Sequence, residues 1–191
     1  DTWAHPSNQK DPASWPDLKT EQKAEAVAGH TTEVLKLLKD NNIDITWIQI
    51  GNEVNTGMLH PMGNINQQSS AANFARFFNA GAAAAKALYP DAYIILHRSN
   101  GHETSKFEWF LDTARALGVK YDMIGMSLYP TWWENGAFVD WRTNTNLCIS
   151  NIKSFSTKYG KPVMICEVGM PVSEPQMSKE ALQYILDQTK A

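Results

Sequence analysis

The sequence has little of several features that mark particular classes of protein. Its 191 residues include only two cysteines, Cys148 and Cys166, which are too few for a disulfide scaffold and too far apart for a short-spaced metal pair. Both lie in apolar stretches, so we expect buried thiols rather than a bridge. No apolar run approaches the roughly 20 residues that a membrane span needs, and none resembles an export signal. The formal net charge of -3 argues against a nucleic-acid partner.

What the sequence does contain is a repeated alternation of strand and helix patterns. Extended runs rich in Ile, Val, Met, Leu and aromatic residues cover 46–53, 93–100, 121–130 and 162–169. Each run is followed by a longer helical pattern, which is typical of parallel βα units. Because the runs are nearly continuous rather than alternating, we expect both faces of each strand to be buried. The sequence therefore predicts an α/β fold in a single domain, residues 1–191.

Helix signals occupy the segments around these strands. We expect helices to begin at Thr20, Ser70, Ser105, about Asp140 and about Ser178, and to end near 41, 89, Gly118, Gly160 and the end of the chain. Ser105 and Glu108 match a capping box. Four strands are too few to close a barrel of eight, and an open partial barrel would expose two strand edges. We therefore expect these residues to come from a longer protein or to pair with another chain.

Each predicted strand ends in polar side chains, at the edge where parallel βα folds place their active sites. They are Asn52 and Glu53, His97 and Asn100, Ser127 and Tyr129, and Glu167. Cleavage of a glycosidic bond with retention needs one neutral carboxylic acid and one ionised carboxylate about 5 Å away. Glu53 fits the acid, in an apolar strand that would favour its protonated form, and Glu167 fits the nucleophile. Asn52 could donate a hydrogen bond to a sugar hydroxyl, and Tyr129 could keep the nucleophile ionised.

Tryptophan is the aromatic residue that most clearly suggests a sugar ligand, because flat indole rings stack on the apolar faces of sugars. Three of the seven tryptophans, Trp3, Trp132 and Trp133, lie in loops and are candidates for stacking. Trp47, Trp109 and Trp141 lie inside predicted elements, where we expect packing. Trp15, in a proline-rich stretch, could serve either purpose.

At these positions the sequence resembles the arabinogalactan endo-β-1,4-galactanases of glycoside hydrolase family 53, which belong to a clan of retaining (β/α)8 TIM-barrel hydrolases. The matching stretches are residues 1–6, 47–53, 57–61, 125–132 and the strand that carries Glu167. The resemblance implies a partial barrel from about helix 3 to helix 7. It also implies that Glu53, ending the fourth barrel strand, is the acid/base and that Glu167, ending the seventh, is the nucleophile.

The resemblance further implies a substrate-binding set around the two carboxylates. Together with the residues at the strand ends, this set is Asp1, Trp3, Asn52, His97, Asn100, Ser127, Tyr129 and Trp132. The chain departs from the family pattern at His5, where Asp is usual, and at Val168-Gly169, where a small polar pair is usual. These departures affect the expected subsites and not the two carboxylates.

We expect no cofactor and no metal. Some family members bind calcium in the loop between strands seven and eight, but that loop is largely absent here. His97 and His102 are five residues apart without a clear third ligand, which argues against a metal site.

The expected partner is a polysaccharide, β-1,4-galactan, with no nucleic acid and no membrane span; the sequence does not predict an oligomeric state. A polymer substrate implies an extracellular, periplasmic or cell-surface location. Two alternatives remain open at this stage. One is a clan hydrolase acting on β-mannan or β-glucan, and the other is a glycan-binding fragment without turnover.

Overall fold

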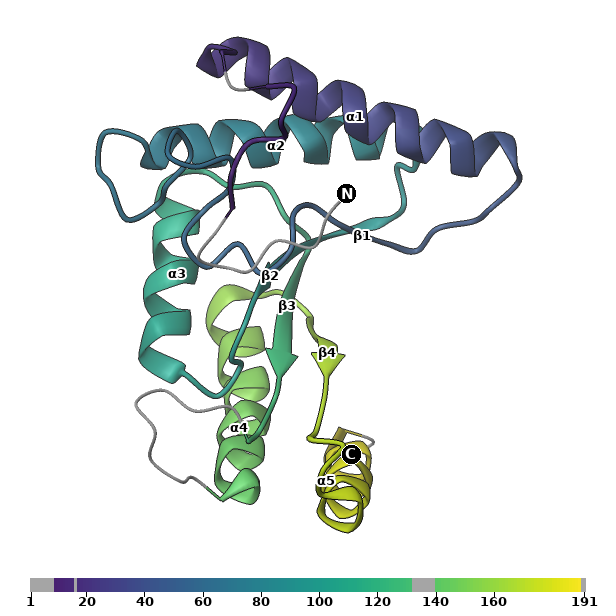
Figure 1. Ribbon diagram of the computed structural model, residues 1–191, viewed down its shortest axis with the longest axis vertical. Helices are drawn as coiled ribbons and strands as arrows, with labels where there is room; N and C mark the ends of the chain where they lie inside the picture. The colour runs from purple at the N-terminus through teal and green to yellow at the C-terminus, as the bar shows by residue number, and fades with distance from the viewer. Residues whose placement is uncertain (1–8, 16, 132–139, 190–191) are drawn as a thin grey trace.

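The computed structural model describes residues 9–15, 17–131 and 140–189, and it contains the predicted alternation of strands and helices (Figure 1). In chain order the elements are α1 (Thr20–Asp40), β1 (Trp47–Gln49), α2 (Ala71–Leu88), β2 (Tyr93–Arg98), α3 (Thr104–Ala116), β3 (Met123–Leu128), α4 (Trp141–Tyr159), β4 (Val163–Val168) and α5 (Pro175–Thr189). The strands are shorter than predicted. Asn52, Glu53, Asn100 and Tyr129 lie beyond the strand ends, whereas His97, Ser127 and Glu167 lie within β2, β3 and β4.

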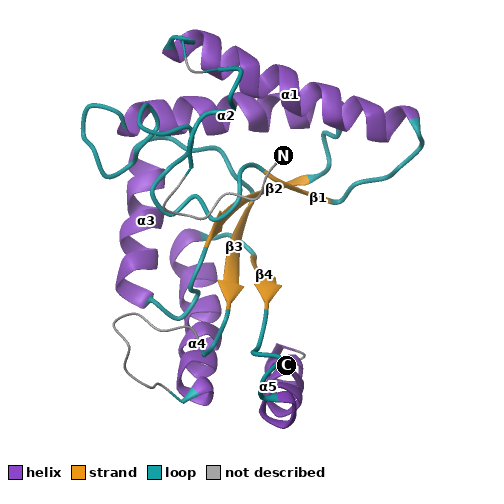
Figure 2. Cartoon of the chain, in the orientation of Figure 1, coloured by secondary structure: helices purple, strands orange, loops and turns teal. Residues whose placement is uncertain are grey.

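The four strands form one parallel sheet in the order β1-β2-β3-β4. Figure 2 shows α1 and α2 lying side by side on the β1 side of the sheet, with α3 and α4 alongside β2 and β3. Each strand lies beside the next one along the chain, which is the connectivity of a (β/α) barrel that is open after four strands. Since all strands run in one direction, their carboxyl ends gather at one edge.

Burial differs between the middle and the outside of this sheet. All six residues of β3 and five of the six in β2 are buried, as predicted. The prediction of burial on both faces is wrong for the outer strands, since β4 is only partly buried and β1 exposes two of its three residues. The physical reason is that β1 and β4 each have a strand neighbour on one side only.

The core lies between the sheet and its helices. It is rich in phenylalanine, with Phe107 stacked on Phe155 at 5.5 Å between ring centroids. In α2 the small residues permit a close approach, because a side chain on Gly81 would meet Ile50 and Val27 at 3.0 and 3.3 Å. The alanine-rich α2 therefore packs closely against Ile50 and α1.

Helix ends follow the predicted signals in most places. Asp140 accepts the N–H of Arg142 at the start of α4, and Gly160 ends that helix in the left-handed region at φ 63. The capping box predicted at Ser105 is wrong, because α3 begins one residue earlier, after Glu103. Similarly, α5 begins at Pro175 rather than near Ser178, and proline is favourable in a first helical turn.

Several predictions about single side chains need correction. Trp47 and Trp109 are 53% and 47% exposed, so they are not packing residues, whereas Trp141 is buried as expected. Trp15 packs against the core, and Trp133 lies outside the described residues. Both cysteines are free as predicted, but only Cys148 is fully buried. Burial raises the pKa of the Cys148 thiol to about 12, which makes it unreactive.

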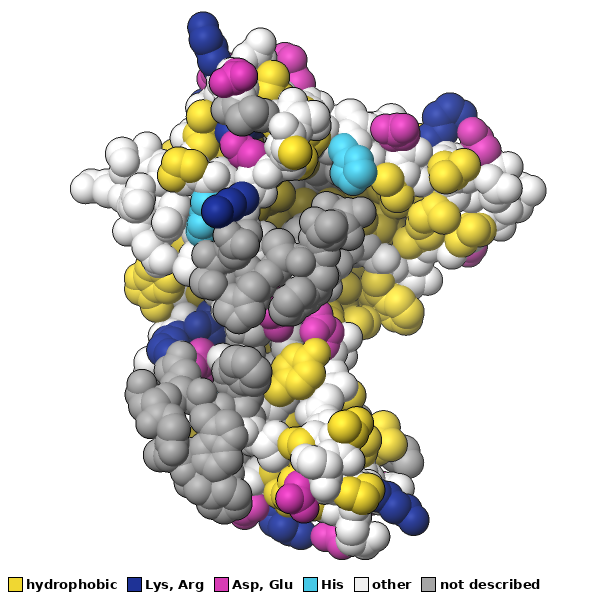
Figure 3. Space-filling model, viewed as in Figure 1, with side chains coloured by type: hydrophobic (Ala, Val, Ile, Leu, Met, Phe, Trp, Pro, Cys, Tyr) yellow, Lys and Arg dark blue, Asp and Glu magenta, His cyan; other side chains and the backbone are white. Residues whose placement is uncertain are grey.

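Apolar side chains are exposed where the half-barrel is open beside β1. They include Val34 and Leu37 on α1, Ile43 in the following loop, and Trp47 on β1. Figure 3 shows hydrophobic side chains gathered along and below α1. Among the described residues, none of the helices has the length and apolar character needed to cross a bilayer.

Candidate active site

Glu53 lies in the loop after β1, and its backbone conformation directs it into the sheet edge. Its φ of 43 lies in the left-handed region, which non-glycine residues adopt at a cost of about 1–2 kcal/mol. The next residue, Val54, anchors the loop to β2, because its N–H donates to the carbonyl of His97 at 2.9 Å. Glu53 is only 6% exposed. The loop therefore holds a carboxyl group in a nearly dry position.

Two buried side chains connect Glu53 to the central strands. Ser127, on β3, donates its hydroxyl to Glu53 Oε1 at 2.6 Å. His97, on β2, lies with Nε2 2.8 Å from the Ser127 oxygen, and its Nδ1 accepts the backbone N–H of Glu53 at 3.4 Å. Both His97 and Ser127 are fully buried. The sequence placed these residues at the same sheet edge, and the structure links them in one hydrogen-bonded chain.

Glu167 reaches the same edge through an irregularity in β4. Met126 pairs with Ile165 but Ser127 pairs with Glu167, so Cys166 is an additional residue in β4. Such a bulge re-aims the side chains that follow it. As a result Glu167 lies level with Ser127 and therefore beside Glu53.

Tyr129, just after β3, is the hydrogen-bond partner of Glu167. Its hydroxyl donates to Glu167 Oε2 at 2.8 Å. Gly169 makes room for the ring, because a side chain there would meet Tyr129 at 2.5 Å. The hydrogen bond to Glu167 and burial raise the pKa of Tyr129 to about 12, so the phenol keeps its proton and remains a donor. The side chain of Glu167 is 32% exposed, far more than Glu53.

His97 is electrically neutral in this site. Burial lowers its pKa to about 4, although the carboxylate of Glu167 acts in the opposite direction. Its Nδ1 is 4.0 Å from Glu167 Oε1, which is too long for a hydrogen bond. The ring therefore serves as an uncharged donor and acceptor near neutral pH.

The two carboxyl groups are close together. One carboxylate oxygen from each of Glu53 and Glu167, and one ring nitrogen of His97, all lie within 4.8 Å of one another. Three such atoms could also surround a metal ion. However, Glu53 and Glu167 each accept a hydrogen bond from a hydroxyl group, an arrangement suited to acid–base work. We assign no metal to this site, and the absence of a metal stays a prediction.

Asn52 precedes Glu53 and presents an amide group whose orientation is fixed. Gln49 donates to Asn52 Oδ1 at 3.1 Å, and Gln9 donates to the Asn52 backbone carbonyl at 2.8 Å. Asn52 Nδ2 is buried and has no hydrogen-bond partner among the described residues. A buried donor of this kind is costly unless a ligand satisfies it. Gln49 and Gln9 were not predicted from the sequence as site residues. For Gln49 there was a signal, because it lies on the strand that leads to Asn52.

The other predicted site residues are less closely placed. Asn100 lies in the turn after β2 with φ 54, and its carbonyl accepts the N–H of Glu103. The hydroxyl groups that bond to the two carboxylates come instead from Ser127 and Tyr129. Asp1, Trp3 and Trp132 lie outside the described residues. Their expected roles, like that of Asn100, stay predictions.

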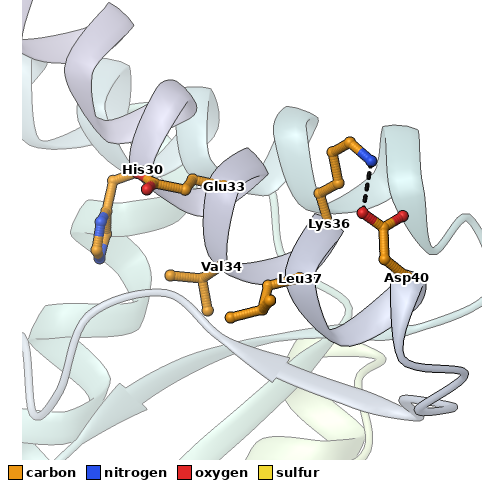
Figure 4. A pocket seen from close by; sticks show the side chains of 6 residues that line it. All are labelled: His30, Glu33, Val34, Lys36, Leu37 and Asp40. Atoms are coloured by element: carbon orange, nitrogen blue, oxygen red, sulfur yellow. Dashed lines mark hydrogen bonds and ion pairs between the residues drawn. The ribbon is translucent and has the colours of Figure 1, made fainter.

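The surface also has a shallow hollow on α1, lined by His30, Glu33, Val34, Lys36, Leu37 and Asp40 (Figure 4). Lys36 and Asp40 form an exposed ion pair in it at 2.6 Å. None of these residues belongs to the strand ends. The chemistry-bearing side chains lie instead at the carboxyl edge of the sheet, where we place the candidate site.

Comparison with known proteins identifies the family of the chain. The sequence profile described as Glycosyl hydrolase family 53 matches residues 1–189. The chain is 32% identical to "Arabinogalactan endo-beta-1,4-galactanase A" of Emericella nidulans, over 90% of this chain and 48% of that protein. It is 31% identical to "Uncharacterized protein in bgaB 5'region" of Niallia circulans, over 98% of this chain and 50% of that protein. The chain spans about half the length of the curated relatives it matches.

Solved structures give the same result for the fold. The chain superposes on "Ignisphaera aggregans GH53 catalytic domain" with a TM-score of 0.76 and 28% identity, covering 88% of this chain and 43% of the other. For a structure of "two fungal beta-1,4-galactanases" the TM-score is 0.77 and the identity 26%, over 90% of this chain and 50% of the other. The four-stranded sheet is thus similar to about half of each of these larger domains.

Proposed function

Because this chain belongs to glycosyl hydrolase family 53, we propose that the protein that contains it is an endo-acting hydrolase of β-1,4-galactan that works with retention of configuration. Glu53 is the general acid and base, and Glu167 is the nucleophile. The family match and the galactanase relatives support the substrate class. The substrate is a polymer, so we also propose that the protein acts outside the cytoplasm, on pectic galactan.

The spacing of the two carboxyl groups is the observation that carries this proposal. Their facing oxygens lie within 4.8 Å, close to the roughly 5–5.5 Å of retaining glycosidases and well below the roughly 6.5–9.5 Å of inverting ones. An inverting enzyme needs room for a water molecule between carboxylate and sugar. That room is missing between Glu53 and Glu167.

The two environments support different roles for the two residues. Burial of Glu53 disfavours its ionised form before the reaction, which suits a proton donor. Glu167 is more exposed and accepts the hydroxyl of Tyr129, which holds one of its oxygens in place and suits a nucleophile that the sugar can reach. Glu167 would bond to the anomeric carbon while Glu53 protonates the leaving oxygen. Water activated by Glu53 would then release the sugar from Glu167.

Asn52 has a separate role in this proposal. Gln49 holds its oxygen, so its buried Nδ2 is directed as a donor. A sugar hydroxyl next to the reacting carbon would satisfy this group, and that contact would strengthen in the transition state.

A substrate panel tests the proposal directly. The intact protein is incubated with β-1,4-galactan, β-mannan and cellulose, and new reducing ends and product lengths are measured. We expect internal cleavage of galactan at least tenfold faster than cleavage of the other polymers. If mannan or cellulose is cleaved faster than galactan, that polymer is the substrate and the proposed specificity is wrong. Binding of galactan oligosaccharides without product after long incubation would show a glycan-binding protein instead.

A further inference from the structure

We propose that His97 and Ser127 are positioning residues that keep the acidic proton of Glu53 on Oε2, so that Glu53 donates it in one fixed direction. The inference rests on the proposed function. It differs from the sequence expectation, in which both residues bind the sugar. In the structure they contact Glu53 and each other and are fully buried.

The hydrogen-bonded chain has a direction that the ring of His97 determines. The backbone N–H of Glu53 donates to Nδ1, so Nδ1 carries the lone pair. A neutral imidazole then has its proton on Nε2, and this N–H donates to the Ser127 oxygen. The hydroxyl proton of Ser127 is consequently directed to Glu53 Oε1, at 2.6 Å. Each hydrogen bond therefore determines which atom of the next group carries the donated proton.

Burial keeps the hydrogen bonds from His97 to Ser127 to Glu53 in the same donor-to-acceptor direction near neutral pH. A second ring proton would put a charge on a fully buried side chain, and burial accordingly lowers the pKa of His97 to about 4. Glu167 is the charged group that faces the ring, and at 4.0 Å from Nδ1 it makes no hydrogen bond to it. The opposite tautomer would leave the Glu53 N–H facing another N–H.

The consequence for Glu53 is a distinction between its two oxygens. Oε1 accepts the Ser127 proton, so the acid carries its own proton on Oε2. In the first step the Oε2–H bond breaks and the glycosidic oxygen gains that proton as its bond to the anomeric carbon breaks, while Glu167 bonds to the anomeric carbon. In the second step a water proton returns to Oε2, and the water oxygen replaces Glu167 on the sugar. No proton passes along His97 and Ser127.

The tautomer can be measured without any assay of activity. The probe is the intact protein with ¹⁵N-labelled histidine, whose ring nitrogens distinguish the tautomers by NMR. We expect His97 in the Nε2–H form between pH 8 and about pH 5. A His97 with its proton on Nδ1, or charged at pH 6, would overturn the proposal whatever the substrate.

The pH dependence of kcat/KM tests the effect on Glu53. A hydrogen bond donated to a carboxylate stabilises its ionised form. Ser127→Ala should therefore shift the basic limb of the kcat/KM profile, where activity falls as Glu53 loses its proton, to higher pH by about one unit. His97→Phe should move it in the same direction by less. His97→Gln keeps an N–H donor and should restore most of the wild-type profile. The double variant S127A/H97F should shift the limb no further than S127A alone, because His97 acts through Ser127.

Ser99→Ala is the matched control. Ser99 is also buried, and its hydroxyl accepts a side-chain hydrogen bond from Asn55 at 2.6 Å. An unmoved limb in Ser127→Ala, or the same shift in Ser99→Ala, would overturn the positioning role. Glu167→Gln separates this failure from that of the proposed function. If Glu167→Gln is inactive while Ser127→Ala has the same basic limb in its pH profile as the wild type, only the positioning role is wrong.

Discussion

Glu53 and Glu167 are chemically identical side chains at one edge of one sheet, yet their surroundings differ in three respects. Glu53 is 6% exposed, follows an outer strand and accepts a hydroxyl from a serine that is itself held by His97. The Glu167 side chain is 32% exposed, follows a bulge and accepts a hydroxyl from Tyr129. In our proposal, burial and the choice of hydrogen-bond donor distinguish the acid from the nucleophile.

The largest effect should come from removing the nucleophile. Glu167→Gln keeps the shape and a hydrogen-bond acceptor for Tyr129 but cannot form the glycosyl-enzyme. We expect kcat on galactan to fall by about 10⁴-fold or more, as measured by reducing-end release. Glu174→Gln changes an exposed glutamate a few residues away and should keep full activity. Substantial activity in Glu167→Gln would remove the distinction between the two carboxylates.

Removal of the acid should produce a smaller and substrate-dependent effect. In Glu53→Ala we expect a loss of about 10²–10⁴-fold on galactan, the usual contribution of general acid–base catalysis. An aryl galactoside with a good leaving group needs little protonation, so its first step should be largely spared. This is measured as the burst of released phenol. Equal losses on galactan and on the activated substrate would contradict the role of Glu53.

The neutral state of His97 predicts a pH-dependent stability. Its folded pKa of about 4 lies below the unfolded value of 6.5, so the unfolded chain binds more protons and folding weakens as pH falls through that window. The expected loss is about 2 kcal/mol between pH 7 and pH 5, measured by denaturant unfolding. His97→Gln should lack this contribution, whereas His30→Gln, an exposed control, should retain it. Identical pH slopes in wild type and His97→Gln would show that folding does not lower the pKa of His97, which would contradict its neutral state in the site.

The smallest effect should follow from loss of the hydroxyl next to the nucleophile. Tyr129→Phe removes one hydrogen bond to Glu167, and we expect kcat/KM to fall about tenfold with the fold intact. Tyr184→Phe is the control, because its hydroxyl bonds to Asn146 on the helical side of the molecule. Unchanged kinetics in Tyr129→Phe would mean that this hydrogen bond does not support the nucleophile.

The sequence was sufficient to predict the order of strands and helices and the family, because these depend on local patterns. Apolar runs predicted the strands, and the polar residues after them predicted the sheet edge that carries Glu53 and Glu167. The resemblance to the family agrees with the family match that followed. The roles of the individual site residues remain proposals.

Features that depend on the register between distant segments could not be predicted. The bulge at Cys166 sets Glu167 level with Ser127, and the left-handed φ of Glu53 aims it at His97 and Ser127. Neither has a sequence signal. Trp47 and Trp109 were placed in the core because they lie in regular elements, but their exposure depends on which neighbours cover those elements.

The central claim is that the fold makes Glu167 the nucleophile and Glu53 the acid. The most direct measurement is peptide mass spectrometry of the intact protein after reaction with an activated 2-deoxy-2-fluoro-β-galactobioside, which slows release of a covalent intermediate. Our account predicts one added disaccharide on the peptide that contains Glu167, and none on that peptide in Glu167→Gln. A sugar attached to Glu53 would contradict the account.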